Sequence, residues 1–349
     1  MTDNRSCIAM ALVVLVVGAC AGCPTRKETI TVAPDGAVAF ALEYEATAAE
    51  FERFDALPNE QGGWRVNWTV KEQRDDGEST KLLTAKREFV AGEQLPRNFA
   101  DPDDANPPLV LDFPTTVKVE RRQDGVYYYF TRTYTPRRWA HIQFSVDVLM
   151  ESLKETMDKP TDELSTKERG LIVQGLAGIE TFKQLEFAKD ALAESAPDLP
   201  VEHRLLARQA LFDVYQEDYV YFLTAFDLCD DLGEKDQDKC FDREAGRILS
   251  EGYTAFVASL RTSAGFTALD VADFENAYER TQRAYRYTEV LGGHHFEIEV
   301  ELPGTIIAHN GNDVREAEDG GNERIVWQFE GKAIFDRSLE LLAVSRVDN

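Results

Sequence analysis

The chain has little positive charge for its length. Its 349 residues include 38 Lys and Arg against 63 Asp and Glu, which gives a formal net charge of −25. A chain with this balance has few cations to neutralise phosphates, so we expect no nucleic-acid partner. Hydrophobic residues make up 43% of the chain. That content is enough for globular domains with substantial cores and excludes a largely disordered protein.

The chain also lacks the short motifs of the common enzyme families. It contains no Gly-x-Ser-x-Gly elbow, no His-Glu-x-x-His, no Gly-x-Gly-x-x-Gly and no phosphate-binding loop. Of its five histidines, His294, His295 and His309 form the one cluster in sequence. Adjacent strand residues point to opposite faces, so such a cluster rarely binds one metal ion. We expect no metal, no cofactor and no catalysis, and an envelope hydrolase ranks last among the alternatives.

The N-terminus carries an apolar run that ends at small residues and a cysteine. Ile8 to Val17 is almost wholly apolar, and Gly18-Ala19 leads directly to Cys20. The run is too short for a transmembrane helix, which needs about 20 apolar residues. The pattern is typical of a lipoprotein signal peptide over 1–19 with Cys20 acylated. The rival acylation site is Cys23, which also follows small residues, and a simple cleaved signal is a second alternative.

The predicted signal peptide and acylated cysteine determine the location and the partners that we expect. The mature protein is expected in the cell envelope, outside the cytoplasm and held to a membrane by its N-terminal lipid. In a Gram-negative host it would face the periplasm or reside at the outer membrane, because Ala21 after Cys20 is compatible with outer-membrane sorting. An envelope protein or an apolar ligand is the further partner that we expect.

Cysteine is scarce, and two residues remain as disulfide candidates once the signal region is set aside. Cys229 and Cys240 are eleven residues apart, about 16 Å along an unbroken helix. A disulfide requires Cα atoms within about 7 Å, so the chain must turn near 232–236. An exported protein favours such a bridge, with two free thiols in a polar loop as the alternative.

The pattern of apolar residues divides the mature chain into four parts. Strand-like alternation and two Asp-Gly hairpins, at 64–90 and 116–134, are followed by a long stretch without strand signals. That stretch has capping-box spacing at Ser165 with Glu168, and Thr267 with Asp270 begins its last helix. The predicted parts are a tether at 20–28, a β-rich region at 29–140, a helical bundle at 141–291 and a C-terminal β region at 292–349.

The C-terminal region is predicted to contain three strands, at 296–302, 325–329 and 339–347, with a polar loop at 310–322. Three strands alone make a meagre core. The economical arrangement is a single antiparallel sheet built from N- and C-terminal strands, with an antiparallel helical bundle inserted between them. The predicted fold class is therefore α+β.

The same region resembles a known family in its order of residues. An apolar strand ends in Pro303-Gly304, Asn310 follows, then Val326-Trp327-Gln328-Phe329, then a closing strand with Leu342-Ala343-Val344-Ser345. This order is similar to the β-rich module of uncharacterised bacterial envelope lipoproteins, including the LppM-like group. The resemblance implies an envelope lipoprotein with an α+β fold and carries no catalytic residues. On structural grounds alone, Asn310 suits a left-handed backbone and Trp327 suits a core position.

A pair of arginines beside aromatic residues is the one candidate ligand site. Arg137, Arg138 and Trp139 follow a tyrosine-rich strand and could bind a carboxylate or a sugar phosphate. The alternative is that the arginines form ion pairs with acidic groups of the bundle. We expect a binding or scaffold module in the envelope. The alternative is a carrier of an apolar or lipid ligand in a cleft between sheet and bundle.

Overall fold

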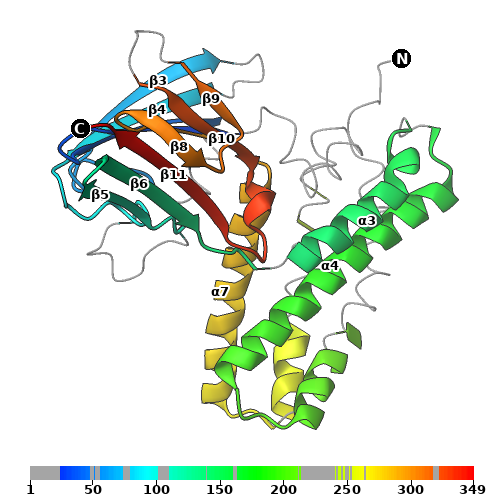
Figure 1. Cartoon of the computed structure of the whole chain (residues 1–349). Helices are drawn as coiled ribbons and strands as arrows, with labels where there is room; N and C mark the ends of the chain where they lie inside the picture. The colour runs from blue at the N-terminus through cyan, green and yellow to red at the C-terminus, as the bar shows by residue number, and fades with distance from the viewer. Residues whose placement is uncertain are drawn as a thin grey trace. The chain divides into compact units, whose positions relative to one another are not determined.

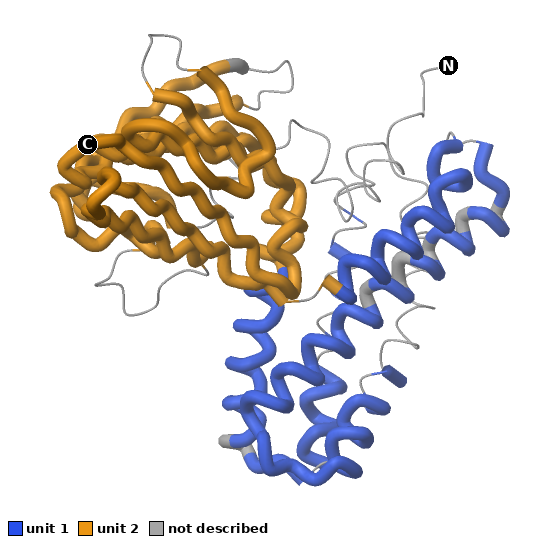
Figure 2. The backbone as a smooth tube through the Cα atoms, viewed as in Figure 1, with its two compact units in different colours: residues 1–18, 141–285 blue, residues 19–140, 286–349 orange. Residues whose placement is uncertain are grey.

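The fold was analysed in a computed structural model of the whole chain. It describes residues 24–47, 51, 56–73, 79–100, 110–138, 140–159, 163–210, 212–213, 240, 243–244, 247, 251, 254–262, 265–316 and 322–349. The chain forms two compact units (Figure 2). The β unit comprises 19–140 and 286–349, and the helical unit comprises 141–285 together with 1–18, which lie outside the described residues.

The β unit consists of two sheets whose inner faces share one core (Figure 1). The larger sheet has seven strands in the order β3 (Arg65–Gln73), β4 (Ser79–Phe89), β2 (Val38–Thr47), β1 (Thr25–Val32), β7 (His295–Glu301), β10 (Arg324–Glu330) and β9 (Asp313–Arg315). The smaller sheet has four strands in the order β5 (Thr115–Arg122), β6 (Gly125–Tyr134), β11 (Leu339–Val347) and β8 (Thr305–His309).

The predicted α+β class and the pairing of strands from both chain ends are confirmed. β1 pairs with β7, and β6 pairs with β11. Both predicted hairpins form, as β3–β4 and β5–β6. The structure differs in having two sheets where one was expected, and in the parallel pairing of β1 with β7. Two facing sheets bury their inner faces against each other, whereas a single sheet could bury its inner face only against helices.

The N-terminal strand begins earlier than the sequence suggested. Residues 20–28 were expected to form a polar tether, but Thr25–Val32 is a strand in the middle of the larger sheet. Its even-numbered residues are all buried, and these include the charged Arg26 and Glu28. The prediction was wrong from Thr25 onward because two charged side chains at inward positions looked like solvated residues.

The C-terminal region also contains two strands that were not expected. β8 follows the Pro303-Gly304 turn, and β9 lies within the segment that was predicted to be a loop. Asn310, between these strands, has no positive φ, so the expected left-handed backbone is wrong. Its side chain instead accepts hydrogen bonds from Trp327 Nε1 and from the backbone N–H of Leu342, both at 2.8 Å. Trp327 belongs to the larger sheet and Leu342 to the smaller one, so Asn310 connects the two.

The described part of the helical unit includes three long helices, of which the last continues into the β unit. They are α3 (Ala140–Met157), α4 (Thr166–Ser195) and α7 (Ala268–Gly292). The capping box of Ser165 with Glu168 is confirmed, and Thr267 with Asp270 makes the reciprocal hydrogen bonds expected at the start of α7. None of the described helices is both long and apolar enough to cross a membrane.

Both connections to the helical unit leave the β unit from the same end. β6 finishes at Tyr134 shortly before α3, and α7 finishes at Gly292 shortly before β7. Tyr134 packs on Phe296 of β7 and Phe329 of β10, with ring centroids 6.0 and 5.4 Å apart. The end of β6 therefore lies beside the start of β7. The short 3₁₀ helix η2 (Gly331–Ile334) closes this end, and the N–H of Gly331 donates to the carbonyl of His294 at 2.9 Å.

Among the described glycines of the β unit, Gly331 is the one where a methyl group fits least. A Cβ there would lie 1.8 Å from the carbonyl oxygen of Leu291, which is fixed backbone at the end of α7. We expect Gly331→Ala to destabilise the β unit by about 2–3 kcal/mol, the upper part of the usual cost of overpacking. Urea denaturation followed by tryptophan fluorescence measures this, because Trp64, Trp68 and Trp327 lie in the β unit.

The matched control is Gly178→Ala in α4. A Cβ at Gly178 meets nothing within 4 Å, and the residue is exposed inside a helix. Alanine should stabilise the helix by about 0.5–1 kcal/mol and leave the unfolding of the β unit, as reported by tryptophan fluorescence, unchanged. Equal effects of the two substitutions would contradict the close approach of η2 to α7.

Candidate functional site

A buried cluster of two arginines and one glutamate lies between the two sheets. Glu28 is fully buried and accepts a hydrogen bond from Arg26 Nε at 2.7 Å on the same strand. It also accepts one from Arg132 Nη1, on β6 of the facing sheet. Arg132 is fully buried as well, and its Nε donates to Thr115 Oγ1 at 2.8 Å. We call Arg26, Glu28 and Arg132 the arginine–glutamate cluster.

Aromatic rings surround the two guanidinium groups of this cluster. The Arg132 guanidinium carbon lies 5.2 Å from the Phe40 ring centroid and 4.9 Å from that of Phe113. The Arg26 carbon lies 5.0 Å from the Phe99 centroid and 5.1 Å from that of Phe113. The negative ring faces attract the cations, so the aromatic side chains supplement the single carboxylate.

The ionisable groups in and near the cluster are held in fixed charge states. Burial by itself would raise the pKa of Glu28, but the charges and hydrogen bonds of Arg132 and Arg26 hold that pKa below its usual range. Burial, reinforced by the Glu28 charge, raises the pKa of Tyr134 to about 12. Burial and the nearby Arg26 charge lower the pKa of His294 to about 3. General acid–base catalysis needs groups whose pKa lies near the working pH. The arrangement therefore suits a structural role.

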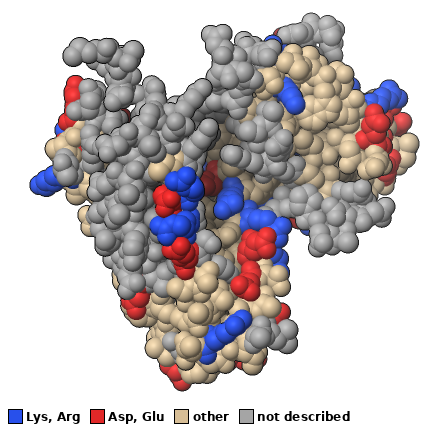
Figure 3. All heavy atoms as spheres, turned by 180° about the vertical axis from the view of Figure 1, so that it is seen from behind, with Lys and Arg blue, Asp and Glu red and all other residues tan. Residues whose placement is uncertain are grey.

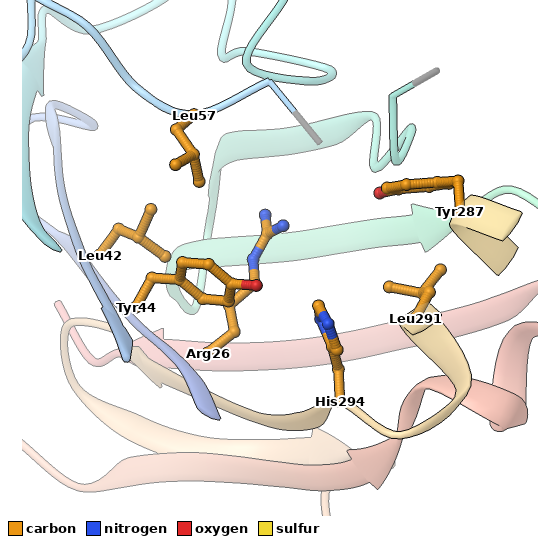
Figure 4. Close-up of a pocket in the computed structure, with 7 residues that line it drawn as sticks. All are labelled: Arg26, Leu42, Tyr44, Leu57, Tyr287, Leu291 and His294. Atoms are coloured by element: carbon orange, nitrogen blue, oxygen red, sulfur yellow. The ribbon is translucent and has the colours of Figure 1, made fainter. Parts of the chain in front are cut away.

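A small cavity adjoins the cluster. Figure 4 shows the Arg26 guanidinium, the Tyr44 and Tyr287 hydroxyls and the His294 ring around one space. Three leucines, Leu42, Leu57 and Leu291, complete the wall. The cavity volume is about 10 Å³, which accommodates about one water molecule. Ligand pockets usually measure about 300–1,000 Å³, so this cavity is too small to hold an acyl chain or a sugar.

Arg137 and Arg138, the described members of the predicted ligand set, are not among the residues that line this cavity. The Arg137 guanidinium carbon lies 4.3 Å from the centroid of the Tyr287 ring, and its backbone N–H donates to Ile334 at 2.8 Å. Arg138 is exposed, and Trp139 lies outside the described residues. Arg137 therefore packs on Tyr287 in the last turns of α7. The ligand-binding role of the three residues stays a prediction.

The three histidines that are close in sequence have different surroundings in the structure. His294 is buried beside Tyr44, His295 lies 3.3 Å from Glu330, and His309 accepts a hydrogen bond from the N–H of Gly311. Among the described residues, no group of His, Cys, Asp and Glu is arranged to hold a metal ion. Cys240 is buried. Cys20, Cys23 and Cys229 lie outside the described residues, so acylation and the Cys229–Cys240 bridge stay predictions.

A second charged network covers the outer face of the larger sheet. Lys27 Nζ lies 2.8 Å from Glu297 and 2.9 Å from Glu299, on the neighbouring strand. Arg315 lies 3.1 Å from Glu299, and Arg324 lies 3.7 Å from it. Burial alone would raise the pKa of Glu297, but hydrogen bonds from Lys27 and Gln328 lower it to about 2. This network joins β1, β7, β9 and β10 on the face opposite to the arginine–glutamate cluster.

Sequence reasoning missed the arginine–glutamate cluster, although a local signal exists. Arg26 and Glu28 share the parity of Ile30 and Val32, and Arg132 shares that of Phe130 and Tyr134. The period of two therefore places all three charged residues on inward faces. No local pattern reveals that β1 and β6 lie opposite each other, so the pairing of the charges was not predictable.

Comparison with known proteins leaves the family open. No family model, no curated protein and no solved structure matches this chain. The resemblance of the C-terminal region to envelope lipoproteins therefore stays a prediction. The functional argument depends on the chain's own residues.

Removal of the Glu28 charge should destabilise the β unit strongly. Glu28→Gln leaves two buried guanidinium groups without their carboxylate, and breaking such a buried pair typically costs about 3–5 kcal/mol. Urea denaturation followed by tryptophan fluorescence measures the loss. Glu43→Gln, at an exposed position of β2, is the control and should stay within about 0.5 kcal/mol of the unsubstituted protein. Equal stability of the two variants would contradict a structural role for the cluster.

The outer network predicts a dependence of stability on pH. The pKa of Glu297 is about 2 in the folded protein and 4.5 as its ordinary value. Its ionised form therefore contributes stability above pH 4.5, and this contribution is lost as the pH falls towards 2. Glu297→Gln should flatten the decline of unfolding free energy across this window. Glu45→Gln, at an exposed position of β2, should leave the slope unchanged. Parallel curves for the unsubstituted protein and Glu297→Gln would refute the assignment.

Proposed function

We propose that the protein is a lipid-anchored, extracytoplasmic lipoprotein that serves as a non-catalytic binding or scaffold module in the cell envelope. The observation that carries the proposal is the N-terminal sequence, an apolar run over Ile8–Val17 followed by Gly18-Ala19-Cys20. The run is too short to span a bilayer and ends where a lipoprotein signal peptide ends. Cys20 is the proposed acylated residue, with Cys23 as the alternative.

The start of the β unit is compatible with cleavage before Cys20. The first described strand begins at Thr25, and the carbonyl of Pro24 accepts a hydrogen bond from His295 at 2.9 Å. Removal of 1–19 would therefore leave every described element intact. The described part of the β unit starts at Pro24, four residues beyond the proposed lipid.

The interior of the β unit favours a scaffold over the alternatives. Its core residues come from both sheets, and the cavity beside Arg26 accommodates about one water molecule. A carrier site inside the β unit would need far more enclosed space than this cavity offers. An envelope hydrolase needs acids and bases poised near neutral pH, and Tyr134 and His294, beside the arginine–glutamate cluster, do not supply them there because their pKa values lie near 12 and 3. Within the described residues of the β unit, no specific observation favours either alternative.

Mass spectrometry of the mature N-terminus tests the proposal. The protein purified from membranes should begin at residue 20 and carry a diacylglyceryl group on that cysteine. Cys20→Ala should abolish the incorporation of labelled palmitate, because no thiol remains at the cleavage site to accept the lipid. The matched control Cys23→Ala should incorporate palmitate normally.

The outcomes separate the alternatives. An acylated N-terminus at residue 23 would identify Cys23 as the acylated residue, and the rest of the proposal would stand. An intact Met1 on a soluble cytosolic product would refute the proposal entirely.

A further inference from the structure

The charged side chains of the described surface are mixed in sign. Figure 3 shows basic and acidic groups interspersed on one face of the molecule. On the outer face of the larger sheet, three cations form ion pairs with the same carboxylate, that of Glu299. A ligand of one charge sign is attracted to a patch of the opposite sign, so this mixed surface favours no such ligand. The crossing of the chain at Asn310 instead brings together groups that can react with one another.

The chain passes from the smaller sheet to the larger one through Asn310-Gly311-Asn312, between β8 and β9. The backbone N–H of Asn310 donates to the carbonyl of Leu342 at 3.1 Å, and its Oδ1 accepts from the N–H of Leu342 at 2.8 Å. Its Nδ2 donates to the carbonyl of Glu340 at 2.8 Å. The side-chain amide of Asn310 therefore takes the place of the next peptide group of β8 in the ladder with β11.

Asn312 makes a similar arrangement with the larger sheet. Its backbone N–H donates to the carbonyl of Val326 at 2.8 Å, and its Oδ1 accepts from the N–H of Gln328 at 2.6 Å. Asparagine side chains can replace backbone groups in this way because their amides are short and polar. The two asparagines therefore continue the ladders at the point where the main chain changes sheets.

The residue between the two asparagines has room only for glycine. A Cβ on Gly311 would lie 2.5 Å from Cγ2 of Ile325 and 3.0 Å from the carbonyl oxygen of Val326. An asparagine followed by glycine is chemically reactive, because the backbone nitrogen of glycine can approach the side-chain carbonyl carbon without obstruction from a Cβ. Asn310-Gly311 is the one Asn-Gly pair in the sequence.

Two sets of hydrogen bonds activate this pair. The Oδ1 of Asn310 accepts from Trp327 Nε1 and from the N–H of Leu342, both at 2.8 Å. Two donors on one carbonyl oxygen stabilise the negative charge that develops there when the carbon is attacked. The N–H of Gly311 donates to Nδ1 of His309 at 3.1 Å, which is within reach for transfer of its proton to a base.

We propose that Asn310 is a self-modifying residue that loses its side-chain amide as ammonia, with His309 as the base. The nitrogen of Gly311 forms a bond to Cγ of Asn310 while its proton passes to Nδ1 of His309. The bond from Cγ to Nδ2 then breaks, and Nδ2 leaves as ammonia with the proton that His309 returns. Asn310 is exposed, so water reaches the cyclic imide and opens it to aspartate or isoaspartate.

The modification alters the crossing between the sheets. An aspartate at position 310 has no N–H to donate to the carbonyl of Glu340 and places a carboxylate oxygen beside it. Isoaspartate adds one carbon to the main chain and displaces Gly311, which fits closely against Ile325. The connection between the sheets therefore weakens with time. The reaction uses only residues of the β unit, so it is independent of the proposed lipid.

Mass spectrometry of the folded, full-length protein tests the proposal. The protein is incubated at neutral pH beside a synthetic peptide of residues 305–316, which lacks the contacts of Trp327 and Leu342. Loss of the amide is read as the mass difference between OH and NH2 on the fragment that contains residue 310. We expect it to be several-fold faster in the folded protein than in the peptide. Asn312 precedes Asp313 instead of a glycine and serves as the internal control, which should keep its amide.

Two variants separate the base from the contacts to the carbonyl oxygen. His309→Gln, at an exposed position, keeps an acceptor for the N–H of Gly311 but removes the base, so the reaction should slow by about a hundredfold. Trp327→Phe removes one donor to Oδ1 and should also slow it. Trp64→Phe, a matched change at another buried tryptophan, should leave the rate unchanged. Urea denaturation verifies that each variant is folded.

Two outcomes would overturn the proposal. A rate in the folded protein that equals or falls below the rate in the peptide would show that the fold protects the amide. Equal rates in the unsubstituted protein and in His309→Gln would remove the base from the reaction, and with it the self-modification proposed for this site.

Discussion

The β unit depends most on the ion pairs that the buried carboxylate of Glu28 makes with two arginines. The carboxylate receives hydrogen bonds from Arg26 on its own strand and from Arg132 on the facing sheet. Two buried guanidinium groups and one carboxylate are stable in a low-dielectric core only while each retains its partner. The two sheets are therefore fixed in one register by charge as well as by packing. Asn310 makes a second polar connection between them through Trp327 and Leu342.

Strand β1, which carries Glu28, also helps to explain how the β unit accommodates a long helical insertion. β1 lies between β2 and β7, and its partners on β7 are 270 residues away in sequence. The two connections to the helical unit leave the β unit beside the start of β7. A chain that enters and leaves at one end does not interrupt a strand. The core residues therefore come from segments before and after the insertion, as in a domain that folds around an inserted one.

Sequence patterns predicted the elements whose signals are local and missed those defined by distant partners. The hairpins at β3–β4 and β5–β6 follow from alternation around Asp-Gly turns, and the caps at Ser165 and Thr267 follow from spacing. The first residues of β1 were assigned to a tether because Arg26 and Glu28 are charged. The pairing that buries them involves Arg132, more than a hundred residues away, and the division into two sheets depends on the same distant contacts.

The place of β1 in the sheet also bears on the proposed lipid anchor. If Cys20 carries the proposed lipid, a pull on that lipid would reach the β unit through Pro24 and Thr25, which come four and five residues after Cys20 in the sequence. An edge strand would separate from one neighbour under such a pull, whereas β1 is hydrogen-bonded along both sides and pulled along its own axis. The bonds of both ladders then share the load. Arg26 and Glu28, the first inward residues of this strand, add a charged attachment to the opposite sheet at the point where the load enters.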